Sequence, residues 1–309
     1  MINIIGKRYI FFAISLLIII PGMIFLAING LNLSIDFTGG SLLEVSFASG
    51  NLPQPAEVIA IYEDLGITNV QVQTTGEGTI LARSSFLEDE SMQTQIVDRM
   101  EADFGDTVTV LRSDSVGPTI GREVAGRAML AVGIAALIVV IYMTFAFRGV
   151  ENSLRYGICA IIAMVHDVAV VLSLAVIGGK FLGWQADSLF VTAVLTVIGF
   201  SVQDKIVVFD RIRENSRTLK KLPFETLVNH SIIQTLQRSI NTQLMTVEFM
   251  LLALVLFGGV TLREFALILL VGLFSGTYSS IFIAAPILVV WEKKEWRNWF
   301  RRSPRPASA

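Results

Sequence analysis

Six long runs of apolar residues, separated by polar segments, dominate the pattern along the chain. A helix that spans a bilayer needs about 20 mostly apolar residues. Three of the runs contain no charged residue, and the other three contain few. The pattern predicts six transmembrane helices, which fall in residues 9–35, 128–147, 156–179, 188–209, 239–262 and 265–291.

The first run follows Lys7 and Arg8, as the apolar core of a secretory signal peptide does. It is longer than the core of a signal peptide, which has about 7–15 residues, and no small-residue cleavage site clearly follows it. We therefore expect a retained anchor, with the first transmembrane helix over residues 9–30.

Lysine and arginine residues are distributed unequally between the two sides of the predicted membrane topology. Short loops on the cytoplasmic side of membrane proteins carry an excess of these residues, whereas the short loops on the other side of this chain hold only Lys180 and Arg263. Both termini are therefore expected in the cytoplasm. Residues 125–292 then hold helices two to six with a basic linker at residues 210–238, and residues 293–309 form a basic tail.

Residues 31–124 lie between the first two runs and are therefore expected outside the cytoplasm. Alternating and helical periodicities predict strands at residues 41–47, 69–75, 79–85 and 107–112 and helices at residues 53–65 and 89–104. The order βαββαβ is that of a ferredoxin-like domain. The acidic run 88–90 fits a helix start better than a metal site, and no residues here form a catalytic constellation.

Composition narrows the classes of function. Hydrophobic residues make up 53% of the chain and charged residues 16%, which excludes a purely soluble protein of typical composition. A net charge of −2 gives no reason to expect nucleic-acid binding. With one cysteine and two histidines, neither an internal disulfide nor a Cys/His metal site is expected.

Asp204 is the strongest candidate for chemistry inside the membrane. An ionisable side chain at the centre of a spanning helix costs about 2.5 to 3.5 kcal/mol, so it usually has a partner or a path to water. Arg238 precedes the fifth run and can reach a similar depth. The two residues form either a proton-exchanging pair or a static pair that fixes helix packing, and Lys205 either reaches the cytoplasmic headgroups or competes as a counter-ion.

His166 and Asp167 lie near the middle of the third run. An imidazole titrates close to physiological pH, so this pair is either a further proton relay or a buried packing pair held by hydrogen bonds. Glu248, in the fifth run, is a weaker candidate, because only its depth recommends it.

Four motifs, taken in order, resemble the SecF side of the SecD/SecF family. They are DFTGG at residues 36–40, VGPTIG at residues 116–121, His166-Asp167, and TVIGFSVQDKIVVFDRIREN at residues 196–215. The resemblance covers nearly the whole chain. It departs from the family at Lys205, where a threonine is usual, at Val171, where a threonine is frequent, and at Glu248, which has no recognised counterpart.

The resemblance implies a six-helix half of the resistance-nodulation-division type in the cytoplasmic (inner) membrane, paired with a similar half from SecD. It implies work beside the SecYEG channel, association with YajC and YidC, and use of the proton motive force to promote export of unfolded polypeptides. Asp204 and Arg238 match the family's membrane aspartate and arginine, both implicated in proton conduction. No enzyme activity and no cofactor are implied, and protons are the coupling ion.

The resulting hypothesis is that protonation of Asp204 weakens its pairing with Arg238 and shifts the helices. The outside domain would then move about hinges at Gly39-Gly40, which follow Asp36, and at Gly117-Pro118. The two glycines fit equally well a turn that needs positive φ angles. Two alternatives remain open: half of a proton-driven exporter of small molecules or lipids, and a passive membrane scaffold.

Overall fold

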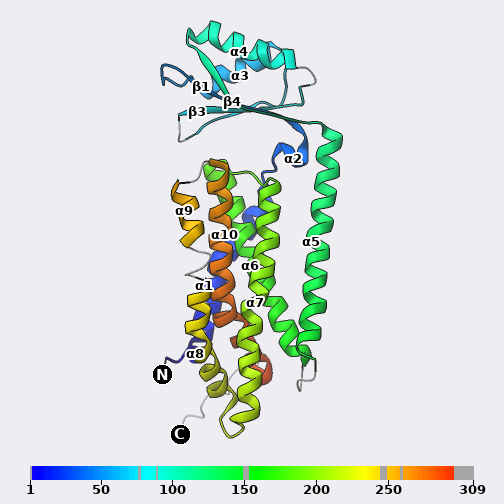
Figure 1. Ribbon diagram of the computed structural model, residues 1–309, viewed down its shortest axis with the longest axis vertical. Coiled ribbons are helices and arrows are strands. Elements are labelled where there is room, and N and C mark those ends of the chain that lie inside the picture. The colour runs from blue at the N-terminus through cyan, green and yellow to red at the C-terminus, as the bar shows by residue number, and fades with distance from the viewer. Residues whose placement is uncertain are drawn as a thin grey trace, which may run out of the picture. The chain divides into compact units, whose positions relative to one another are not determined.

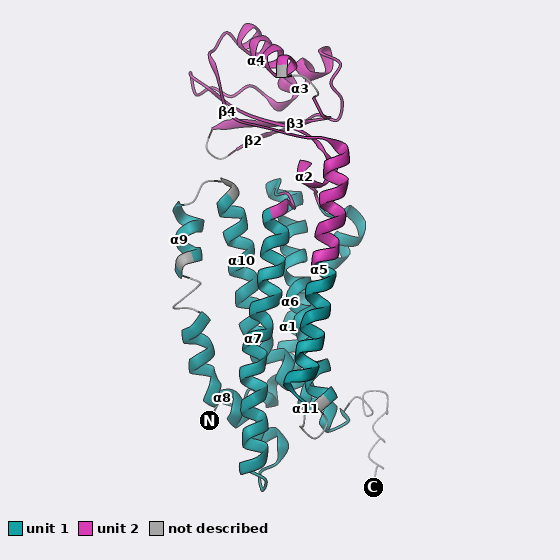
Figure 2. Ribbon diagram, turned by 45° about the vertical axis from the view of Figure 1, so that its right-hand side comes forward, with its two compact units in different colours: residues 1–31, 132–184, 189–309 teal, residues 32–131, 185–188 magenta. Residues whose placement is uncertain are grey.

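The computed structural model describes residues 2–75, 78–87, 90–148, 153–243, 249–257 and 260–295. The chain forms two compact units, shown in different colours in Figure 2. One unit comprises residues 1–31, 132–184 and 189–309, and the other comprises residues 32–131 and 185–188. Each unit has its own core and is described by itself.

The first unit is helical, and its long helices run alongside one another (Figure 1). Its elements are η1 (Ile5–Lys7), α1 (Arg8–Asn29), the second part of α5 (Pro118–Ala146), α6 (Ser153–Leu182), α7 (Ser188–Thr218), α8 (Phe224–Gln243), α9 (Phe249–Phe257), α10 (Val260–Ser279), the π-helix η3 (Ser280–Ala284) and α11 (Ala285–Glu292).

Five helical segments in the described residues are long and apolar enough to cross a membrane. They are Ile5–Asn29, Pro118–Ala146, Leu154–Leu182, Ser188–Thr218 and Leu262–Glu292. The run 239–262 does not give one long helix in the described part of the chain. It falls on the end of α8, on α9 and on the start of α10, and residues 244–248 and 258–259 lie outside the described residues.

Small residues let the helices of this unit approach closely. A Cβ atom added to Gly22 of α1 would lie 2.1 Å from Cβ of Ser173 on α6, and one added to Gly272 of α10 would lie 2.3 Å from a methyl group of Val197 on α7. Such contacts are typical of membrane helices, which associate by close packing of small residues. Gly22 therefore allows a close approach of α1 to α6, and Gly272 allows a close approach of α10 to α7.

Helix α7 continues beyond the expected span to Thr218, and a short turn leads to α8. The charged segment at the end of α7 is stabilised by the ion pairs Arg211–Glu214 and Arg213–Asp210. Asn215 is buried and donates to Oγ of Ser231 on α8 at 2.8 Å. This contact ties the first half of α8 to the end of α7.

The second unit is a four-stranded antiparallel sheet with the strand order β2-β3-β1-β4. Helices α3 and α4 cover one face of the sheet (Figure 2). The elements are α2 (Ile35–Thr38), β1 (Gly40–Phe47), α3 (Pro55–Asp64), β2 (Gln71–Thr74), β3 (Thr79–Ser84), α4 (Glu90–Phe104) and β4 (Val108–Val116).

The core of this unit lies between the sheet and its two helices. Val45 and Ile80 of the sheet, Val58 of α3 and Ile96 and Met100 of α4 are fully buried there. The six expected strands and helices are present in the expected order. Strand β4 runs further than expected, and the short helix α2 was not expected from the sequence.

Candidate functional site

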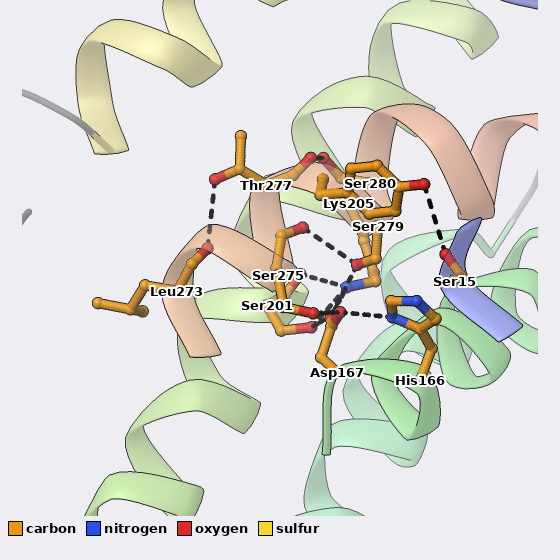
Figure 3. Close-up of polar contacts among 12 residues, drawn as sticks. Ser15, His166, Asp167, Ser201, Lys205, Leu273, Ser275, Thr277, Ser279 and Ser280 are labelled. Carbon is orange, nitrogen blue, oxygen red and sulfur yellow. Dashed lines mark hydrogen bonds and ion pairs between the residues drawn. The ribbon is translucent and has the colours of Figure 1, made fainter. Parts of the chain in front are cut away.

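A buried ion pair lies at the centre of the helical unit. Nζ of Lys205, on α7, is 2.7 Å from Oδ2 of Asp167, on α6, and both side chains are completely inaccessible to solvent. Figure 3 shows the two side chains pointing toward each other. Removing two charges from water is costly unless the pair has good geometry and further hydrogen bonds.

Serine hydroxyls supply those further hydrogen bonds. Ser201 of α7 and Ser279 of α10 donate to Oδ2 of Asp167, at 2.6 and 2.7 Å, and Ser275 of α10 donates to Oδ1 at 2.8 Å. The ammonium group of Lys205 also donates to Oγ and to the backbone carbonyl of Ser201. The carboxylate therefore joins α6, α7 and α10.

Lys205 thus lies in the core and does not reach the headgroups. Of the two sequence interpretations, that of a counter-ion is the one found, although the anion is Asp167 and not Asp204. The sequence contains a signal for this arrangement. Lys205 falls at helical spacing in the buried stripe of α7 that also includes Ile198, Ser201, Val208 and Ile212.

His166 contacts the same carboxylate. Its Nδ1 is 3.0 Å from Oδ1 of Asp167, and because an ionised carboxylate only accepts hydrogen bonds, Nδ1 carries the hydrogen. Nε2 is buried and has no hydrogen-bond partner among the described residues. The ring stacks on Tyr278, with 6.3 Å between centroids. The contact expected between His166 and Asp167 is present, and whether it carries protons stays a prediction.

Asp204 forms a second polar site on the neighbouring face of α7. Oγ of Ser239, on α8, donates to Oδ1 at 2.7 Å, and Oγ of Ser280, the first residue of η3, donates to Oδ2. Asp204 is half-buried. It lines a pocket of about 220 Å³ together with Gln203, Arg238 and Ser239. The carboxylate therefore has neutral hydroxyl partners and an adjacent space large enough for water.

The expected direct pairing of Asp204 with Arg238 is wrong for this structure. Among the ion pairs of the described residues, none joins these two side chains. Successive residues of a helix point about 100° apart. Ser239, the neighbour of Arg238, donates to Asp204, whereas the Arg238 side chain is exposed and lines the same pocket.

The glycine motif after the first helix forms a turn. Gly39 and Gly40 have φ angles of 75° and 135°, which other residues rarely adopt. A Cβ atom on Gly40 would lie 2.7 Å from the carbonyl oxygen of Ser84. The turn interpretation is therefore confirmed, and a hinge at these glycines stays a prediction.

The other motif residues lie around this turn. Oδ2 of Asp36 accepts hydrogen bonds from the backbone N, at 3.0 Å, and from Oγ, at 2.8 Å, of Ser188, the first residue of α7. Pro118 is the first residue of α5 and follows Gly117, a position that suits the fixed φ of proline. Glu248 lies outside the described residues. In the described part of the chain, no group of three His, Cys, Asp or Glu side chains could hold a metal ion.

Two family models match this sequence. One, described as the C-terminal part of the protein export membrane protein SecD/SecF, matches residues 96–294. The other, described as the SecD/SecF GG motif, matches residues 24–50 and includes the turn at Gly39 and Gly40.

Curated relatives match the chain along all or nearly all of its length. Protein translocase subunit SecF of Anaerolinea thermophila is 72% identical over 309 residues, which cover 100% of both chains. The SecF subunit of Thermobaculum terrenum is 45% identical, again over 100% of both chains. SecDF of Thermus thermophilus is 36% identical over 297 residues, which are 93% of this chain and 38% of that protein.

Solved structures show the same similarity. The crystal structure of SecDF from Thermus thermophilus superposes with a TM-score of 0.82 at 34% identity, over 94% of this chain and 39% of that one. SecDF in its super-membrane-facing form superposes with a TM-score of 0.65 at 31% identity, over 96% of this chain and 40% of that one. This chain is therefore similar to about two fifths of a SecDF protein. The chain belongs to the SecD/SecF family of protein export membrane proteins, and within it to the SecF subunits.

Proposed function

We propose that this SecF subunit of the Sec protein translocase works with a SecD subunit and uses the proton motive force to promote export of polypeptides across the cytoplasmic membrane. The single observation that carries the proton step is the environment of Asp204. Its carboxylate has hydroxyl partners on two different elements, α8 and η3, and lines a pocket.

Protonation of Asp204 would change these contacts in a defined way. The ionised carboxylate accepts one hydrogen bond from Ser239 and one from Ser280. The protonated acid gains an O–H donor and loses acceptor capacity on that oxygen. The serine hydroxyl on that oxygen then donates to a neutral group, and this hydrogen bond is weaker than one to a carboxylate. The connection of α7 to α8 or to η3 therefore loosens.

The proton gradient is large enough to drive such a change. A charge that crosses a potential of 100 mV releases about 2.3 kcal/mol. Because about 1.4 kcal/mol changes an equilibrium constant tenfold, this energy biases a two-state equilibrium by nearly 50-fold. Arg238 lines the same pocket as Asp204. In this proposal it supplies positive charge at the pocket, and the two side chains do not form a fixed pair.

The finer architecture is part of the proposal. We take the membrane part to have six helices, with the fifth within residues 239–262, and residues 31–124 to form a ferredoxin-like domain outside the cytoplasm. The observed strand order and antiparallel pairing support that domain type. Both termini, the linker 210–238 and the tail 293–309 would lie in the cytoplasm.

The partners are proposed in the same way. The name of SecDF from Thermus thermophilus combines SecD and SecF, and that single chain is 36% identical to this one over the matched residues. This similarity supports SecD as the partner here. The SecYEG channel, YajC and YidC are proposed as further partners from the family resemblance. The outside domain would move about Gly39-Gly40 and Gly117-Pro118 and hinder backsliding of the emerging polypeptide.

The test is proton-driven export in vesicles that contain the full chain, SecD and the SecYEG channel with its ATPase. Asp204→Asn keeps the shape of the side chain but cannot exchange a proton, and we expect it to abolish the increase in export that a proton gradient gives. Asp210→Asn is the matched control, because Asp210 is exposed on the same helix and pairs with Arg213. Full gradient-driven export by Asp204→Asn would exclude the proposal and favour a passive scaffold.

A further inference from the structure

We propose that Lys205 is a built-in counter-ion that holds Asp167 permanently ionised, so that Asp167 takes no part in proton exchange, whereas Asp204 is an acid that exchanges protons. The second half of this statement depends on the proposed function, whereas the first half does not. Lys205 would then be a positioning residue of the proton pathway.

The ammonium group of Lys205 uses its full hydrogen-bond capacity. The ammonium group has three N–H donors, and the structure gives it three acceptors: Oδ2 of Asp167, Oγ of Ser201 and the backbone carbonyl of Ser201. No donor is left for another acceptor. The ammonium group is therefore stable in this position, because all of its donors are satisfied.

The carboxylate of Asp167 is equally saturated. It accepts from five donors, which are His166, Ser201, Lys205, Ser275 and Ser279. A carboxylate has about four lone-pair positions. A proton added to either oxygen would have to displace one of these donors, and the buried ammonium would lose its anion.

The charged and titratable groups around Asp167 support the same conclusion. From α6 the facing group is His166, from α7 it is Lys205, and from α10 the contacts in the described residues are the neutral hydroxyls of Ser275 and Ser279. The two titratable neighbours are both bases. Neither offers a competing negative charge that would favour the protonated acid.

The contrast with Asp204 separates the two acids by function. Asp204 precedes Lys205 in the sequence, so the two side chains point about 100° apart on the helix. Asp167 has no solvent-accessible surface, whereas Asp204 is half-buried and lines a pocket. Helix α7 thus presents a locked charge toward α6 and an exchangeable one toward α8.

Infrared spectroscopy of the full chain in lipid vesicles tests the charge state directly. The carbonyl stretch of protonated carboxylic acids is followed as the pH is lowered, and bands are assigned by comparing variants. Compared with the unmodified chain, we expect the single variant Asp204→Asn to lack one titrating band and the single variant Asp167→Asn to lack none. In Lys205→Met, we expect a new band that Asp167→Asn removes. A band that Asp167→Asn removes from the unmodified chain would overturn the proposal, as would Lys205→Met without a new band.

A second measurement covers the case that Lys205→Met does not fold. Removing one member of a buried ion pair leaves an uncompensated charge, whereas replacing both members is often tolerated. The double variant Asp167→Asn with Lys205→Met should therefore recover the thermal midpoint that each single variant loses. Equal loss in the double variant would contradict a charge pair. Lys180→Met, at an exposed position of α6, is the matched control.

These outcomes are independent of export. If Asp204→Asn exported normally while the infrared bands behaved as described, the proposed function would fail and the role of Lys205 as counter-ion would stand. If export failed in Asp204→Asn while Asp167 titrated in the unmodified chain, the reverse would hold.

Discussion

Ser279 and Ser280 are consecutive residues, yet their hydroxyl groups donate to two different aspartates. Ser279 ends α10 and donates to Asp167 at 2.7 Å, whereas Ser280 begins the π-helix η3 and donates to Asp204. One junction in the chain therefore contacts both acids. Such π-helical turns are rare and are frequently found at functional sites.

We expect substitutions of the two serines to affect different properties, namely the unfolding free energy for Ser279 and gradient-driven export for Ser280. Ser279→Ala leaves the buried Asp167 with one donor fewer, which should cost about 1–3 kcal/mol of unfolding free energy. Ser280→Ala removes one of two hydroxyl partners of the half-buried Asp204, and we expect a several-fold loss of gradient-driven export with a smaller change in stability. Thermal unfolding and vesicle export measure the two effects, and identical behaviour of the two variants would refute the separation.

We expect the contact between α1 and α6 not to tolerate a larger side chain at Gly22. A Cβ atom there would lie 2.1 Å from Cβ and 2.8 Å from Cα of Ser173, so Gly22→Val must push the two helices apart. Overpacking of this kind typically costs about 1–3 kcal/mol. Gly133→Val on α5 is the control, because no atom lies within 4 Å of its Cβ position, and its thermal midpoint should change little. A stable Gly22→Val variant would contradict the close approach.

We expect the turn before β1 to be destabilised by substitution of Gly40. Gly40→Ala would place a side chain at a φ of 135° and 2.7 Å from the carbonyl oxygen of Ser84, and strained backbone of this kind costs about 1–3 kcal/mol. Gly117→Ala meets no atom within 4 Å and should be tolerated. Limited proteolysis of residues 32–131 in the full chain measures both variants. Equal resistance of the two would contradict a requirement for glycine at position 40.

We expect the stability of the start of α8 to depend on pH through Glu225. A hydrogen bond from Lys293 and the charges of Lys293 and Arg8 hold the pKa of Glu225 below its ordinary value of 4.5, although partial burial opposes this shift. The two cations lie 2.7 and 3.1 Å from its carboxylate. Because the folded pKa is the lower one, the stabilisation is present above pH 4.5 and is lost as the pH falls through the folded pKa.

Hydrogen exchange of the hydrogen-bonded amides at the start of α8, from Leu227 onward, checks this expectation. Protection there should fall on acidification in the unmodified chain and should depend less on pH in Glu225→Gln, which has no carboxylate to lose. Glu214→Gln, on the exposed end of α7, should keep the pH dependence of the unmodified chain. An unchanged acid response in Glu225→Gln would show that other groups control it.

Much of the fold could be predicted from the sequence because its signals are local. Long uncharged runs such as residues 128–147 identify spanning helices wherever the rest of the chain lies, since each helix satisfies its own backbone hydrogen bonds. Alternating and helical periodicities likewise gave the order of strands and helices in residues 40–116. The positions of Asp204 and His166-Asp167 at membrane depth also follow from counting along one helix.

The partners of those acids depended on the tertiary structure. Spacing within α7 shows that Asp204 and Lys205 face different directions, but it does not show which helix lies on each side. Packing places α6 beside Lys205 and places α8 and η3 beside Asp204, so that Lys205 binds Asp167 and two serines hold Asp204. Which ionisable residues lie within a spanning helix can be read from the chain alone, because that is a property of one segment. Which charges are paired was decided by contacts between segments far apart in the chain.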